Sequence, residues 1–221
     1  MILARLMDIG LEKLKDIVLG MASLSEKTVV TSVQAYSSGT ASREIRDWSE
    51  DLRKMQEEVS ELSIEIIARY QPVASDLRFV KSCMEISYGF QRIGRYAYDI
   101  DQVLEMFGNL SECDRSVVET TASATREMMR MSIEAFTKRD IELARRTRKL
   151  DDFVDQKYRD YVASAIKNPK SDIRCSMSAT LILRYLERIA DHCSSIGDSV
   201  FYIVSGEKSP RKSLDSETTT R

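Results

Sequence analysis

Residues 182–203 read ILRYLERIADHCSSIGDSVFYI, and residues 86–107 read ISYGFQRIGRYAYDIDQVLEMF. Each segment carries an apolar side chain at every third or fourth position, which is the spacing of one face of an α-helix. The two apolar stripes match at a constant offset of 96 positions, and the pairs are Ile86 with Ile182, Phe90 with Leu186, Ile93 with Ile189, Ala97 with Cys193, Ile100 with Ile196, Leu104 with Val200 and Phe107 with Ile203. A shared offset over all of these positions indicates an internal duplication.

The rest of the chain is also predicted to be helical. Only 8 Gly and 3 Pro interrupt its 221 residues, and helix-forming side chains dominate the stretches between them. Turn and cap signals predict helices at about 1–36, 42–70, 72–107, 111 or 114–137, 141–168 and 172–205, the last capped by Ser171 or Asp172. Short connections require antiparallel neighbours. We therefore expect an all-α fold of two tandem antiparallel three-helix bundles, over residues 1–108 and 109–206, followed by a disordered tail at 207–221.

Composition excludes several classes of protein. Lys and Arg number 33 against 35 Asp and Glu, so the net charge of −2 argues against a nucleic-acid binder. No stretch approaches 18 uninterrupted apolar residues, which predicts a protein that is at most peripheral to a membrane. The four cysteines are scattered without CxxC spacing. We interpret them as free thiols in a reducing cytosol.

The duplicated helices differ in their polar residues. Glu187 and Asp191 are one helical turn apart in the second copy, on the side opposite the apolar stripe, and are expected to face outward. Asp151 and Asp155 form a second pair on the preceding helix. If these two helices are antiparallel neighbours, the four carboxylates converge and supply the hard oxygen ligands that Mg, Mn, Fe or Ca accept. The alternative is a solvated acidic face balanced by nearby arginines such as Arg184 and Arg188.

Other catalytic chemistry lacks a sequence basis. His192 is the only histidine, and no GxSxG nucleophile motif accompanies it, so a polar helix position is its expected role. No Walker A sequence is present, because Gly206-Glu207-Lys208-Ser209 lacks the upstream glycine loop. The sequence therefore predicts neither a triad hydrolase nor an ATPase.

Two segments carry a family resemblance. Residues 69–78 read RYQPVASDLR and residues 185–192 read YLERIADH, and together they resemble the PhoU family of phosphate-uptake regulators over nearly the whole chain to Gly206. The resemblance implies two three-helix bundles and E/D-x3-D motifs that hold multinuclear iron or zinc clusters at the surface. The positions that match these motifs in the second bundle are Asp151, Asp155, Glu187 and Asp191.

The first bundle departs from the family pattern. The equivalent of its second motif reads Gln91 and Arg95, and the equivalent of its first motif reads Ser49 and Arg53. A guanidinium cannot ligate a cation and stays charged at physiological pH. We therefore expect at most one metal cluster, on the C-terminal bundle. The nearby Asp47–Asp51 pair does not restore a convincing ligand set, and Arg95 is instead expected to pair with Asp99.

The resemblance also implies a function. It predicts a cytoplasmic, non-enzymatic homodimer that regulates phosphate uptake by contacting the ATPase subunit of a phosphate ABC transporter and a sensor histidine kinase. Two alternatives are also consistent with the sequence. The lost motif of the first bundle fits a divergent regulator of another transporter, and the carboxylate cluster fits a metal-dependent hydrolase.

Overall fold

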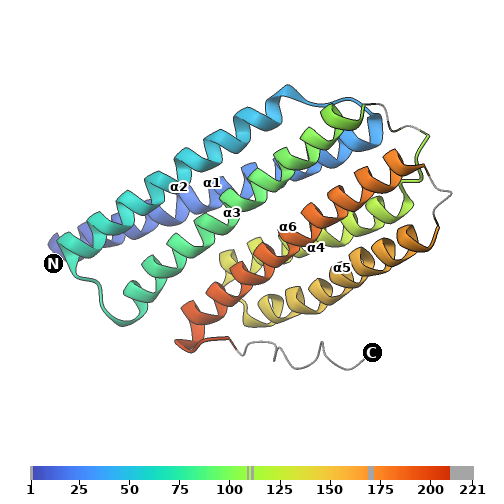
Figure 1. The fold of residues 1–221 in the computed structure, drawn as a ribbon. Coiled ribbons are helices and arrows are strands. Elements are labelled where there is room, and N and C mark those ends of the chain that lie inside the picture. Colours follow the sequence, from blue (N-terminus) through green and yellow to red (C-terminus); the bar gives the residue numbers. More distant parts are fainter. Residues whose placement is uncertain (1, 109, 111, 169–171, 210–221) are drawn as a thin grey trace.

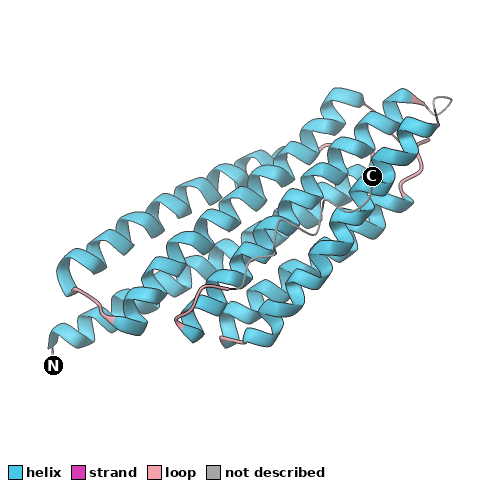
Figure 2. Ribbon diagram, turned by 60° about the horizontal axis from the view of Figure 1, so that its bottom comes forward, coloured by secondary structure: helices cyan, strands magenta, loops and turns pink. Residues whose placement is uncertain are grey.

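The computed structural model describes residues 2–108, 110, 112–168 and 172–209. Within these ranges the chain forms helices and connecting turns, with no strand (Figures 1 and 2). The helices are α1 (Ile2–Ser38), α2 (Arg43–Tyr70), α3 (Ala74–Phe107), α4 (Ser116–Lys138), α5 (Ile141–Lys167) and α6 (Ile173–Ser205). The predicted all-α class is confirmed.

The helices form two antiparallel three-helix bundles that lie side by side. Helices α1, α2 and α3 pack on one another, and so do α4, α5 and α6. Figure 1 shows the two bundles side by side, with α3 and α6 running in opposite directions where the bundles meet. Contacts between α3 and α6, and to a smaller extent between α1 and α4, join the bundles. The architecture predicted from the duplication is therefore correct.

The apolar stripes that revealed the duplication form the centres of both bundles. Ile86, Phe90 and Ile93 of α3 are fully buried, as are Ile182, Leu186 and Ile189 of α6. Met128 and Met129 of α4 are fully buried in the core, and Met131 is buried as well. The repeated stripe thus supplies apolar residues at the centre of each half, and the buried residues of both halves belong to one continuous core.

Helix ends follow local backbone chemistry. Gly39 has a φ of 74° after α1, as a left-handed cap requires. Asp172 caps α6, because its Oδ1 accepts hydrogen bonds from the backbone N–H of Arg174 (2.7 Å) and of Cys175 (3.4 Å). Helix α3 begins at Ala74 and not at the expected Pro72, since Val73 is still extended. The cap candidates Ser111 and Ser171 lie outside the described residues, as do residues 210–221 of the tail expected at 207–221.

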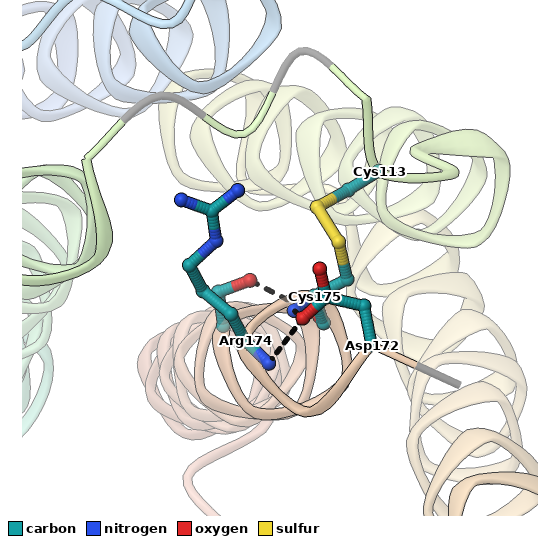
Figure 3. Close-up of a disulfide and its surroundings, with 5 residues drawn as sticks. Cys113, Asp172, Arg174 and Cys175 are labelled. Carbon is teal, nitrogen blue, oxygen red and sulfur yellow. Dashed lines mark hydrogen bonds between the residues drawn. A yellow bond between two sulfur atoms is a disulfide. The ribbon is translucent and has the colours of Figure 1, made fainter. Parts of the chain in front are cut away.

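The expectation of four free thiols is wrong for two of them. Cys113, in the connection before α4, forms a disulfide with Cys175 in the first turn of α6, with a Cα–Cα distance of 5.4 Å (Figure 3). The two residues are 62 positions apart, and they meet because the α3–α4 connection and the start of α6 share one end of the molecule. Cys83 and Cys193 are free and buried, as expected.

Helix α6 occupies a central place that a single helical wheel does not reveal. It packs against α4 and α5 of its own bundle and against α3 of the other. Gly197 permits a close approach to α5, because a Cβ at this position would lie 3.1 Å from the backbone oxygen of Ala144. Consequently the side of α6 opposite its apolar stripe is also partly covered.

No helix within the described residues is long and apolar enough to cross a membrane.

Candidate functional site

An acidic cluster lies where α5 and α6 pack against each other. Asp151 and Asp155 project from successive turns of α5, and Asp191 comes from α6. Carboxylate oxygens of these three residues lie within 4.8 Å of one another. Among the described residues, this is the one group of three or more acidic, histidine or cysteine side chains that approach so closely. The predicted convergence of the two helices is therefore observed for three of the four carboxylates.

The three carboxylates differ in their access to solvent. Asp151 is only 9% exposed, whereas the side chain of Asp191 is 43% exposed. Asp155 is intermediate, and Arg159 one turn later approaches it at 3.9 Å. The cluster therefore extends from the α5–α6 interface to the surface, and a solvated ion can reach it without passing through the core.

Glu187 is positioned differently from its prediction. Its side chain is only 14% exposed, so the expectation that it faces outward is wrong. Both of its carboxylate oxygens accept hydrogen bonds from Nη1 of Arg184, each at 2.5 Å. Glu187 is therefore held by an arginine, one turn away from the acidic cluster on the same helix.

Burial and mutual repulsion make the charged carboxylates costly. Desolvation is the main cause that raises the pKa of Glu187, and Asp191 and Asp155 raise it further against the opposing effect of Arg184. Desolvation likewise raises the pKa of Asp191, with an added contribution from Asp155, while Arg188 at 3.3 Å lowers it. At both residues the arginines outweigh the neighbouring carboxylates, so desolvation is what keeps the two pKa values raised. A cation bound at the cluster would favour the charged carboxylates.

The first bundle has no corresponding cluster among its described residues. Ser49 is buried, and Arg53 pairs with Glu50 (2.6 Å) and with Glu57 on the surface of α2. Arg95 forms the expected ion pair with Asp99, at 3.1 Å. At two of the four equivalent positions, the first copy thus carries a positively charged arginine, Arg53 or Arg95, where the second copy carries a carboxylate.

His192 lies at the interface between the bundles. Its ring stacks on Tyr96 of α3, with centroids 5.9 Å apart, and meets the edge of Tyr88 at 6.0 Å. Burial is the main cause that lowers its pKa to about 4, and Arg92 and Arg188 lower it further. His192 is therefore an aromatic packing residue, and the expectation of a simple polar helix position missed its partners on α3.

Each of the two bundles also matches the same family of known proteins. A family model described as "PhoU domain" matches residues 18–104 and, separately, residues 118–200. The chain belongs to the PhoU family. The two matches fall in the first and second bundles respectively, with the α3–α4 connection between them.

Individual PhoU proteins match over most of their length. A Pseudomonas putida protein named "Phosphate-specific transport system accessory protein PhoU homolog" is 33% identical over 205 residues, which are 89% of this chain and 79% of the relative. The Escherichia coli K12 protein named "Phosphate-specific transport system accessory protein PhoU" is 29% identical over 204 residues, covering 89% and 84%. The crystal structure of PhoU from Pseudomonas aeruginosa superposes with a TM-score of 0.82 at 28% identity, over 90% of this chain and 99% of that one.

Proposed function

We propose that this PhoU-family protein is a cytoplasmic, non-enzymatic accessory protein that regulates phosphate uptake. The observation that carries the proposal is the match of both halves of the chain to the PhoU domain, together with relatives named as phosphate-specific transport accessory proteins. The proposed partners are the ATPase subunit of a phosphate ABC transporter and, where the cell has one, a sensor histidine kinase. Such an ATPase subunit works on cytoplasmic ATP, so its regulator acts on the same side of the membrane.

The proposed mode of action is protein–protein contact by a homodimer. Two packed bundles present long helical faces, which suit docking along an extended surface. Light scattering of the purified chain tests the dimer, and a monomeric mass at micromolar concentration would exclude it.

Affinity capture from native cells tests the proposed partners. The tagged chain should retain subunits of a phosphate transporter after a salt wash, and an equally expressed unrelated helical bundle should not. Recovery of another carrier in their place would favour the alternative regulator, which the loss of carboxylates at Ser49, Arg53, Gln91 and Arg95 motivates. Absence of any phosphate-transport subunit would contradict the main proposal.

We propose further that the acidic cluster of the second bundle binds a metal. Asp151, Asp155 and Asp191 would be the ligands, with Glu187 as a fourth carboxylate released from Arg184. The donor set fits a hard cation, because its oxygens lie within 4.8 Å of one another and one side reaches solvent. The described cluster offers no nitrogen or sulfur ligand, so iron or manganese suits it better than zinc.

The same cluster motivates the hydrolase alternative. A metal held by carboxylates activates water in several classes of phosphoesterase. Phosphate-ester turnover with Mn²⁺ or Fe²⁺, abolished by Asp191→Ala, would favour that function over regulation. Inactivity of the metal-loaded protein across a panel of esters is the result that the regulatory proposal expects.

A further inference from the structure

The Cys113–Cys175 disulfide joins the connection between the bundles to α6. Leu110, three residues before Cys113, is buried in the core, and the backbone N–H of Cys113 donates to its carbonyl oxygen at 3.1 Å. On the other side of Cys113, Arg115 donates to the carbonyl oxygen of Ser37 at the end of α1. The connection is therefore attached to the first bundle through Arg115 and to the second through the disulfide.

The four cysteines fall into two groups with different access. Cys83 and Cys193 are fully buried, and desolvation raises the pKa of both thiols, that of Cys83 to about 12. Cys175 is only half-buried and lies at the end of the molecule, beside the exposed residues Asp172 and Arg174 (Figure 3). Cys113 is buried, with 8% of its surface exposed, so Cys175 is the more accessible end of the disulfide for a small thiol, whereas Cys83 and Cys193 are enclosed in the core.

We propose that Cys113 and Cys175 are a site of reversible thiol–disulfide exchange with low-molecular-weight thiols, which locks the inter-bundle connection onto α6 when oxidised. The inference rests on the cytoplasmic location in the proposed function. In that reducing compartment, disulfides of most proteins are transient and redox-sensing and do not serve as permanent staples.

The exchange balances with a glutathione-type thiol as reductant. Its thiolate attacks Sγ of Cys175, a mixed disulfide forms, and the Cys113 thiolate leaves and takes a proton. A second thiolate attacks the sulfur of the bound small thiol, which yields the oxidised small disulfide and frees Cys175. Two electrons pass from two small thiols to the protein disulfide, and the reverse sequence closes the bond again.

Reduction is expected to act locally. It frees the connection from the first turn of α6, while Leu110 and the Asp172 cap keep each segment close to its place. Asp191 lies about 24 Å further along α6 at 1.5 Å per residue, so the acidic cluster should keep its geometry. Reduction therefore increases the mobility of the α3–α4 connection relative to α6 and leaves the candidate metal site intact.

Redox titration of the full chain tests the proposal. The protein is equilibrated in buffers of reduced and oxidised glutathione, free thiols are alkylated, and mass spectrometry of peptides reads each cysteine separately. The disulfide fraction should fall measurably between the oxidising buffer and a buffer with the glutathione ratio of cytoplasm. Cys83 and Cys193 serve as internal controls and should stay unmodified throughout. A pair that stays oxidised in the reducing buffer, or never forms, overturns the proposal.

Hydrogen exchange measures the mechanical consequence. On reduction, amide exchange in residues 112–116 and 173–178 should become about tenfold faster, and that around Asp191 should not change. The Cys113→Ala, Cys175→Ala double variant should match the reduced protein in both buffers. Equal exchange in the oxidised and reduced chains would refute the lock. Capture of transporter subunits is a separate readout, so a failed redox titration with successful capture removes only the switch.

Discussion

Removing the Cys113–Cys175 bond should destabilise the C-terminal bundle by a calculable amount. The bond closes a segment of 62 residues that contains α4 and α5. In the chain-entropy description, cross-linking a loop of this length lowers the entropy of the unfolded chain by about 14 cal/mol/K, which corresponds to about 4 kcal/mol at 25 °C. We therefore expect reduction to lower the free energy of unfolding by about 4 kcal/mol.

Urea denaturation followed by circular dichroism measures this loss. With an m-value of about 2.5 kcal/mol/M, the midpoint should fall by about 1.5 M on reduction. Comparison of oxidised and reduced wild type isolates the cross-link, because both contain the same atoms in the core. The Cys113→Ala, Cys175→Ala variant should behave like the reduced protein and ignore reductant. A midpoint that moves by less than about 0.3 M would refute the entropic reasoning, since it corresponds to under 1 kcal/mol.

Three further substitutions test the site and the packing. Asp191→Asn should leave the chelator-treated protein equally or more stable, because burial already disfavours the charged form of Asp191. In thermal melts with Mn²⁺ at a hundredfold excess over its Kd, wild type should gain about 2.7 kcal/mol of stability and the variant should gain none. The pKa of His192 is depressed from 6.5 to about 4, so its stabilising contribution is present above pH 6.5 and is lost as the pH falls towards 4. Allowing for solvent screening, the free energy of unfolding of wild type should fall by about 1–2 kcal/mol more than that of His192→Asn over this range. Parallel plots of unfolding free energy against pH for the two proteins would refute this role. Gly94→Ala places a Cβ 2.2 Å from Cδ1 of the buried Leu52 and should cost about 1–3 kcal/mol in urea melts. The comparison variant Gly10→Ala places its Cβ 3.3 Å from Cγ1 of Ile66 and should cost clearly less; an equal cost in the two variants would refute the steric explanation.

The fold could be predicted because both copies of the duplication have the helical spacing of apolar residues, which is a local pattern. The stripes on residues 86–107 and 182–203 have the helical period, and glycine and proline signals separate the remaining helices. Helix ends were predicted to within a few residues, as at Ala74 against Pro72, because their caps depend on neighbouring side chains. Both kinds of signal are local in sequence.

The candidate site was predicted only in part. Helical spacing identified the acidic pairs, and the antiparallel order of α5 and α6 implied that they converge, as Asp151, Asp155 and Asp191 do. The burial of Glu187 could not be read from one helical wheel, because a wheel assigns one core side, and α6 packs against α3, α4 and α5. The disulfide was missed for a related reason, since Cys113 and Cys175 meet only through the tertiary arrangement of distant segments.

We propose that the two copies of one fold differ in metal binding, with the carboxylates of the second copy as ligands. Elemental analysis of protein purified without chelator measures this difference, with wild type beside a Glu187→Ala, Asp191→Ala double variant. The matched control is Asp47→Ala, Asp51→Ala, an acidic pair of the same spacing that is exposed on α2 of the first bundle. We expect bound iron or manganese in wild type and in the control, and loss of the metal from the Glu187→Ala, Asp191→Ala variant. Equal metal content in all three proteins would rule out these carboxylates as the ligands.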